Sequence, residues 1–186
     1  MRWKLSKFWL WVLFLASGLP VLGAGISEYS LKGLFLYNFT KFVTWPDKSF
    51  SGAEAPLIIG VLGDDPFGKT LEKIVDGKTF QDRPIRVVHF DGFDPRQAAS
   101  IGKCQILFIC SSENDDIGVI LDAIKESSVL TVSEYVDFPA KGGMILLFRK
   151  ENRLALRINP EAAKKAGLQI SSKLLQISEI YQAEDN

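Results

Sequence analysis

The residues that most strongly suggest chemistry are GDDPFGKT at 63–70, which match the phosphate-binding pattern G-x-x-x-x-G-K-[ST]. In that pattern backbone N–H groups surround a phosphate, the lysine reaches the β- and γ-phosphates, and the hydroxyl holds Mg²⁺. Here Asp64 and Asp65 would put two negative charges beside a triphosphate, and Pro66 has no N–H to donate. No acidic Mg²⁺ partner ends the apolar run at 104–110. We therefore expect no ATP binding, and we interpret Asp65 as a helix cap with Pro66 in the first helical position.

Other catalytic or metal-binding patterns are weak. The single histidine, His89, falls on an expected strand, and no G-x-S-x-G nucleophile motif accompanies it. No His, Cys and Asp cluster has metal-ligand spacing, so we expect neither a metal nor a cofactor. Cys104 and Cys110 flank one apolar strand, whose extended length of about 20 Å would keep them from bridging. We expect both to be buried core residues.

Acidic and hydroxyl side chains follow the carboxyl ends of three expected strands, where ligands gather in open α/β sheets. They are Asp64, Asp65, Ser111, Ser112 and Ser133. Together they could form a small polar or cation-binding crevice. The competing interpretation is that most of them cap helices.

The elements that would position these residues alternate between apolar runs and helical segments. Strands are expected at 57–62, 85–90, 104–110 and 129–132, with helices at 67–76, 94–102 and 116–127. Residues 143–159 read as a β-hairpin turning at 150–152, and two short helices close the chain at 160–167 and 170–182. Several strands are apolar on both faces, which is typical of a covered parallel sheet. The sequence predicts an α/β fold with a mostly parallel central sheet flanked by helices, in Rossmann-like or flavodoxin-like layers, and a C-terminal β-hairpin at one edge.

The first expected helix, at 27–46, carries an apolar sector of about 200°, wider than docking on a sheet requires. Such a sector indicates either deep burial or a contact surface for a partner or a dimer mate. If it is buried, Lys32 would extend its amine to solvent and Asn38 would hydrogen-bond to the backbone. The candidate surface residues are Leu31, Phe35, Asn38, Phe42 and Trp45, joined by Ser172, Lys173 and Leu174 from the closing segment.

The beginning of the chain has the features of an export signal. Three basic residues in 1–7 precede about 12 apolar residues, fewer than the roughly 20 that a spanning helix needs. We expect a signal peptide at 1–24, cleaved between Gly23 and Ser27, and a single exported α/β domain at 27–182. The full chain has a formal net charge of zero, so the mature chain would be mildly acidic, and we expect no nucleic-acid partner.

Seven segments in this order and spacing resemble the YfiR-like family of periplasmic proteins. They are FLYNFTKFVTWP, GDDPFG, RPIRVV, CQILFI, VLTVSE, FPAKGGMI and LRINPEAAKKAGLQISSKLL. The resemblance covers roughly residues 31–176, and the segments are moderately specific singly and strong as an ordered set. The family pattern has GDDPFG without a required Lys-Thr, which would make the match of Lys69 and Thr70 to a phosphate loop accidental.

The resemblance implies a regulator rather than an enzyme: a repressor of a membrane-bound diguanylate cyclase, acting through the cyclase's periplasmic sensor part. Weaker repression would raise cyclic di-GMP and favour biofilm formation. Relatives are also thought to form homodimers and to respond to redox state through disulfides. Because this chain has only Cys104 and Cys110, redox sensing by an intramolecular disulfide is not expected here.

Two functions from different classes follow. The first is a regulatory binding protein whose output is contact with another protein, which requires apolar contact surfaces and no catalytic group. The second is a periplasmic small-ligand binding or hydrolytic domain, which requires a deep pocket around Asp64, Asp65, Ser111 and Ser112. The residues of this chain favour the regulatory binding protein.

Overall fold

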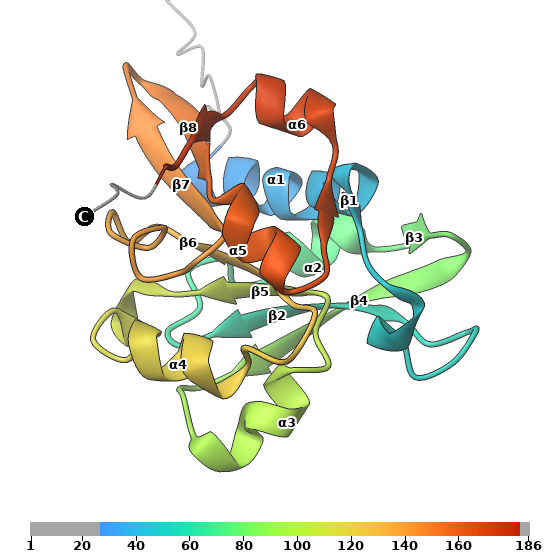
Figure 1. Ribbon diagram of the computed structural model, residues 1–186. Helices are drawn as coiled ribbons and strands as arrows, with labels where there is room; N and C mark the ends of the chain where they lie inside the picture. Colours follow the sequence, from blue (N-terminus) through green and yellow to red (C-terminus); the bar gives the residue numbers. More distant parts are fainter. Residues whose placement is uncertain (1–26, 183–186) are drawn as a thin grey trace, which may run out of the picture.

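A computed structural model describes residues 27–182, so the expected signal peptide at 1–24 lies outside the described residues. An eight-stranded sheet with the order β10-β8-β7-β6-β5-β2-β4-β3 forms its centre, and β1 and β9 make a separate two-stranded pair (Figure 1). The strands of the large sheet are β2 Leu57–Leu62, β3 Thr79–Phe80, β4 Arg83–Phe90, β5 Ile106–Ile109, β6 Leu130–Ser133, β7 Ile145–Lys150, β8 Arg153–Ile158 and β10 Glu179–Ile180. The small pair is β1 Val43–Thr44 and β9 Gln169–Ile170.

The central strands are parallel. β4, β2, β5, β6 and β7 pair in parallel, whereas β8 runs antiparallel to β7 and β3 runs antiparallel to β4. Counted along the chain from β2, the parallel strands have the order 2-1-3-4-5, which is the flavodoxin-like order. The predicted fold class is confirmed, including the β7–β8 hairpin, whose turn residues Glu151 and Asn152 have positive φ.

Helices cover both faces of this sheet (Figure 1). They are α1 Glu28–Phe42, α2 Thr70–Val75, α3 Ala98–Ile101, α4 Ile117–Ala123, α5 Pro160–Lys165 and α6 Ser172–Gln176. α1 and α2 pack on one face together with residues of α5 and α6, while α3 and α4 pack on the other. Within residues 27–182, no helix combines the length and the apolar character that a bilayer crossing requires.

The core consists of two apolar clusters, and the side chains of the central strands β2 and β5 alternate between them. In β5, Ile106 and Phe108 face α1 and α2, whereas Leu107 and Ile109 face α3 and α4. All four side chains are fully buried. Because successive side chains of a strand point to opposite faces, a strand buried on both sides must be apolar at every position, which explains the unbroken run of the sequence here.

Four predicted boundaries are wrong, and one of them is the end of α4, which lies at Ala123 rather than at residue 127. α2 begins at Thr70, so Asp65 does not cap it. Instead, Asp65 Oδ1 accepts a hydrogen bond from the N–H of Phe67 at 2.8 Å, inside the loop. α1 ends at Phe42, because the next residues become β1 and pair with β9. The closing helix ends at Gln176 rather than continuing to Gln182.

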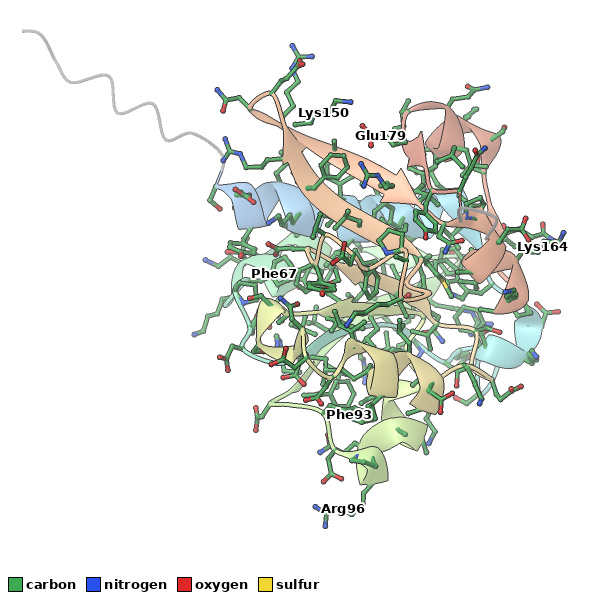
Figure 2. The ribbon with its side chains drawn as sticks, turned by 60° about the vertical axis from the view of Figure 1, so that its left-hand side comes forward. Phe67, Phe93, Arg96, Lys150, Lys164 and Glu179 are labelled. Carbon is green, nitrogen blue, oxygen red and sulfur yellow. The ribbon has the colours of Figure 1, made fainter. Side chains whose placement is uncertain are left out.

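The last of these differences changes the edge of the sheet. Residues after α6 form β10, which pairs in parallel with β8 and lies outside the hairpin. Glu179 holds it there through ion pairs to Lys150 at 2.6 Å and to Arg157 at 2.8 Å, and Figure 2 labels Lys150 and Glu179 near each other. A two-residue strand is too short to leave a periodic signal in the sequence.

Candidate functional site

In flavodoxin-like sheets the ligand crevice lies at the carboxyl ends of the first and third parallel strands, which here are β2 and β5. The loops after these strands contact each other directly. The N–H of Asp64 donates to Ser112 Oγ at 2.9 Å, and Ser112 Oγ donates to Glu113 Oε1 at 3.2 Å. Glu113 is only 8% exposed, and its Oε2 accepts from the N–H of Phe93 at 3.0 Å. Side chains of the protein therefore fill the position of the crevice.

The five crevice candidates do not converge on one space. Asp64, Ser111 and Ser112 are exposed, and Asp65 is half-buried. Ser133 is fully buried, donates to the carbonyl of Ile109 at 2.9 Å and accepts from the N–H of Tyr135 at 3.3 Å. The structure brings Asp64 and Ser112 together but gives Ser133 a structural role inside the sheet.

The GDDPFGKT loop is anchored by its phenylalanine rather than arranged around a phosphate. Phe67 is 4% exposed and packs edge-on against Phe108 of β5 and Tyr29 of α1, with ring centroids 4.9 Å and 5.6 Å away (Figure 2). Gly63 has a φ of +97°, and its N–H donates to the carbonyl of Phe90 at 2.9 Å. The motif is thus a connection that fixes α1 and the β2 loop on the sheet.

His89 is a partly exposed surface residue between two carboxylates. Its Nε2 lies 2.7 Å from Glu72 Oε1, and its Nδ1 lies 3.5 Å from Asp65 Oδ2. These contacts connect β4, α2 and the loop at 63–69. No group of three or more His, Cys, Asp or Glu residues in the described part of the chain is arranged to hold a metal ion.

Lys32 on α1 is the most unusual charged residue. It is 2% exposed and forms ion pairs with Glu28 at 2.6 Å and with Glu134, which follows β6, at 2.8 Å. Its amine also lies 4.5 Å from the centre of the Tyr29 ring. Lys32 therefore does not extend to solvent, and that part of the interpretation from sequence is wrong. Asn38 likewise accepts from Lys41 Nζ at 3.2 Å rather than bonding to the backbone.

The surface candidates divide into half-buried, exposed and core residues. Leu31, Phe35, Asn38 and Phe42 are half-buried, and Ser172 and Lys173 are exposed. Trp45 is 5% exposed and donates from Nε1 to the carbonyl of Gln105 at 2.9 Å, and Leu174 is 2% exposed. Trp45 and Leu174 thus belong to the core of the subunit.

Some exposed apolar residues were not among the surface residues predicted from the sequence. Leu34 on α1 is 38% exposed, and Ile177 and Ile180, on either side of the β10 start, are 70% and 43% exposed. Leu34 lies within the helix expected at 27–46, but the helical period alone does not tell which apolar residues of that helix face the sheet. Ile177 and Ile180 were assigned to a helix that ends before them.

Both cysteines are free and buried, as the strand position predicted. Burial raises the pKa of the Cys104 thiol to about 12. The pKa of Cys110 also rises to about 12, first because of burial and then because of nearby carboxylates such as Asp65. A buried thiol with such a pKa has very little thiolate near neutral pH and is unreactive.

We expect neither thiol of the folded protein to react with 5,5′-dithiobis(2-nitrobenzoate) near pH 8, and both to react after unfolding in guanidinium. Between about pH 9 and pH 12 the folded thiols keep their protons, whereas the unfolded thiols lose them. The unfolding free energy should therefore fall over this range, by up to about 1.4 kcal/mol per thiol and pH unit. Rapid labelling of the folded protein would contradict the buried position of the thiols.

A cavity of about 630 Å³ opens at the other edge of the sheet, near the amino ends of β6 and β7. None of the five crevice candidates lines it. This cavity is therefore not where the sequence placed a ligand site.

Comparisons with known proteins identify a family and a fold. The model of the YfiR/HmsC-like family matches residues 29–179. The crystal structure of a conserved domain protein from Vibrio cholerae O1 biovar El Tor is similar in fold, with 11% identity, a TM-score of 0.58, and coverage of 84% of this chain and 60% of that chain. An ABC domain in complex with L-Trp from Streptococcus pneumonia has 10% identity and a TM-score of 0.46, with coverage of 67% of this chain and 55% of that one. No match was found among curated proteins.

The chain spans less than two thirds of either solved structure, and the likeness to the Vibrio protein concerns the fold alone. The family match is more informative, because it covers most of the chain. It supports, at the level of the family, a periplasmic regulatory protein of the diguanylate cyclase system, and members of this family are regulators rather than enzymes.

Proposed function

The chain belongs to the YfiR/HmsC-like family, and from this premise we propose that it represses a membrane-bound diguanylate cyclase by binding the cyclase's periplasmic part. Weaker binding would then raise cyclic di-GMP inside the cell and favour biofilm formation. The expected export signal at 1–24 would deliver the protein to the periplasm, where such a sensor part is accessible. A homodimer is the form we propose for the regulator.

The observation that carries this proposal is the apolar exposure along α1. In addition to the residues that α1 buries in the core, Leu34 is 38% exposed, and Phe35 and Phe42 pack against the core with part of their surface left open. A helix that packs only on a sheet has no need of three large apolar side chains outside the fully buried core, whereas a protein contact does.

The start of α6 lies next to this part of α1. The N–H of Ser171 donates to the carbonyl of Phe42 at 2.8 Å, and β1 pairs with β9 just before α6. This contact makes Ser172 and Lys173 neighbours of the carboxyl end of α1. We define the α1–α6 surface as Leu31, Leu34, Phe35, Asn38, Phe42, Ser172 and Lys173 and propose it as the contact for the cyclase or for a second copy.

The test uses exposed positions, so that loss of binding is separate from loss of folding. We expect Leu34→Asp to weaken association at least about tenfold, since a charge in an apolar contact must be desolvated, and Lys173→Glu to do the same because it reverses the charge that the partner meets. Association would be measured by sedimentation for the homodimer and by copurification for the cyclase. In cells, both variants should raise cyclic di-GMP.

Three variants serve as controls. Val119→Asp on α4 and Lys164→Glu on α5 make the same changes at exposed positions outside the α1–α6 surface. Leu174→Ala removes a core side chain and should lower stability by about 2–5 kcal/mol. If Leu34→Asp and Lys173→Glu behave like Val119→Asp and Lys164→Glu in every measurement, the proposed surface is wrong.

The small-ligand or hydrolytic alternative finds less support. It needs an open crevice around Asp64, Asp65, Ser111 and Ser112, but Ser112 and Glu113 close that position by bonding to the neighbouring loops. We therefore do not propose chemistry at the carboxyl edge of the sheet.

A further inference from the structure

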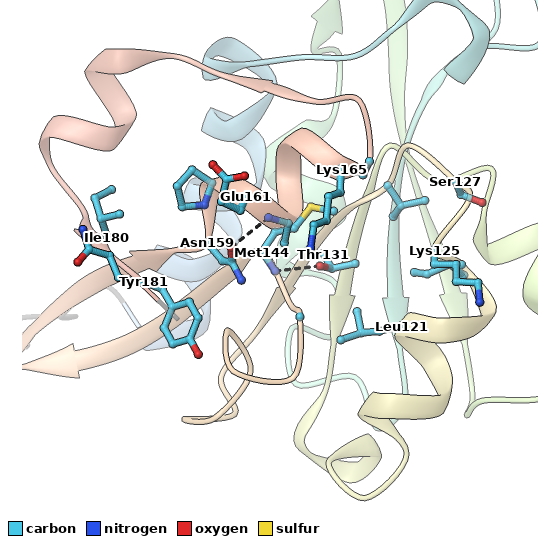
Figure 3. Close-up of a pocket in the computed structure, with 17 residues that line it drawn as sticks. Leu121, Lys125, Ser127, Thr131, Met144, Asn159, Glu161, Lys165, Ile180 and Tyr181 are labelled. Carbon is cyan, nitrogen blue, oxygen red and sulfur yellow. Dashed lines mark hydrogen bonds between the residues drawn. The ribbon is translucent and has the colours of Figure 1, made fainter. Parts of the chain in front are cut away.

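The cavity at the amino edge has the size of a small-molecule site. Its volume of about 630 Å³ falls within the roughly 300–1,000 Å³ typical of ligand pockets. Figure 3 shows it between α4 on one side and α5 with β10 on the other. We call this cavity the amino-edge groove.

The groove exists because β6 and β7 diverge. Their parallel ladder comprises only the pairs Val132–Ile145 and Ser133–Leu146. One residue earlier, the N–H of Met144 donates to Thr131 Oγ1 at 3.1 Å in place of a backbone carbonyl. The two strands therefore separate toward their amino ends and leave a space that no helix fills.

The floor of the groove is apolar. It is formed by Leu121, Ile124, Val129, Met144, Ala162 and Ala166. Ile124, Val129 and Met144 are also buried members of the core, so the floor is part of the rigid structure. An apolar ligand group placed here would remove water from both surfaces, which favours binding.

Two polar side chains around the groove, Asn159 and Lys125, have partners within the protein. Asn159 Nδ2 donates to the carbonyl of Pro139 at 3.1 Å, and its Oδ1 accepts from the N–H of Ala162 at 3.0 Å. Lys125 is paired with Asp122 at 3.0 Å. Tyr181 lies on the side of the groove away from Lys165 (Figure 3), and Glu161, one helical turn before Lys165 on α5, forms no ion pair with any residue in 27–182. Asn159 and Lys125 are therefore not free to bind a ligand in the middle of the groove.

Two hydrogen-bond donors, Lys165 and Thr131, lie in the middle of the amino-edge groove. Lys165 forms no ion pair with any residue in 27–182, and in Figure 3 its side chain extends into the groove toward Thr131. Thr131 is 2% exposed, and its hydroxyl accepts from Met144 but donates to no residue within the same range. Lys165 and Thr131 are both donors and one of them is a cation, so the ligand group that matches this pair is an anionic acceptor.

From this combination we infer that the amino-edge groove binds a small apolar monocarboxylate. The aromatic or aliphatic body of the ligand lies on the apolar floor, and its carboxylate pairs with the Lys165 ammonium and accepts a hydrogen bond from the Thr131 hydroxyl. This site is separate from the α1–α6 surface and does not depend on the proposed cyclase contact.

The first test compares three probes that share one body. 4-Phenylbutyrate is expected to bind with a dissociation constant on the order of 1 mM, the range for a ligand of its size. 4-Phenylbutan-1-ol and 4-phenylbutylamine are expected to bind at least about tenfold more weakly, because they lack the anion. In ¹H–¹⁵N correlation spectra the amide shifts caused by phenylbutyrate should include Thr131, Ala162 and Ala166.

The second test uses two adjacent lysines. Lys165→Glu should weaken phenylbutyrate binding at least about tenfold, whereas Lys164→Glu, also exposed on α5 but outside the groove, should leave it within about twofold. Both changes alter the net charge equally, so a general electrostatic effect would affect both. Equal binding of the three probes, equal effects of the two variants, or amide shifts confined to another part of the chain would overturn the inference.

Discussion

Replacing Lys32 by alanine is expected to lower the unfolding free energy by about 3 kcal/mol, measured by urea denaturation. The change removes a side chain that is 2% exposed and leaves Glu28 and Glu134 close together without their shared cation. Removing one partner of a buried ion pair usually costs about 3–5 kcal/mol. Because the two carboxylates are 38% and 25% exposed, water can compensate part of the loss, and the lower end applies.

Lys41→Ala is the matched control on the same helix. Lys41 is exposed, contacts Asn38 and the Tyr37 ring, and should contribute less than about 1 kcal/mol. Lys32→Met keeps most of the buried volume and removes only the charge, which separates the two effects. If Lys32→Ala costs no more than Lys41→Ala, Lys32 is not buried between the two carboxylates in solution.

The pH dependence of this contribution follows from the pKa of Lys32. Burial by itself lowers that pKa, but the hydrogen bonds and charges of Glu134 and Glu28 outweigh burial and hold the pKa above the ordinary value of 10.5. The folded state therefore binds the proton more tightly, so the stabilisation is complete below about 10.5 and is lost as the pH rises through the folded pKa. The stability difference between wild type and Lys32→Met should be constant from about pH 7 to about pH 9 and shrink above about 10.5.

The sheet and its layers could be predicted because the signal is local. Strands such as β2 and β5 are apolar at nearly every position, and this property alone requires helices on both faces. The turn of the β7–β8 hairpin was also predictable, because Glu151 and Asn152 form a short polar interruption between two runs rich in apolar residues. Family resemblance added nothing to these features that the residues did not already indicate.

Features that depend on contacts between distant residues could not be predicted in the same way. The spacing of Glu28 and Lys32 indicates a pair on one helix face, but nothing local indicates that Glu134 completes it. Likewise, Asp65 followed by Pro66 has the pattern of a helix start, yet tertiary packing of Phe67 delays α2 until Thr70.

The candidate site shows the same limit. The sequence correctly brought Asp64 and Ser112 to one edge of the sheet, because topology alone determines which strand ends are neighbours. It could not show that Ser112 and Glu113 would fill the space between the loops, since that depends on side-chain packing. The amino-edge groove has no sequence signal either, because it results from the early divergence of β6 and β7.

The two glycines of GDDPFGKT differ in the space around them, and this difference tests whether the loop is a packed connection between strands. A side chain at Gly63 would be strained by its φ of +97° and would contact Ser112 Oγ and, at 2.9 Å, Glu113 Cγ. Gly68 also has a positive φ, +53°, but nothing lies within 4 Å of the position of an added Cβ. The closeness of the two loops thus requires glycine only at Gly63.

We therefore expect Gly63→Ala to lower the unfolding free energy by about 3 kcal/mol, from backbone strain together with overpacking against Ser112 and Glu113. Gly68→Ala should cost only about 1 kcal/mol, because its conformation is near the left-handed region that other residues can adopt. Adding Ser112→Gly to Gly63→Ala should recover part of the loss, since it removes one of the two contacts while the backbone strain remains. Urea denaturation of the four proteins, including the wild type, measures all three differences. Equal costs at the two glycines, or no recovery in the double variant, would mean that contact between the β2 and β5 loops is not what requires glycine at Gly63.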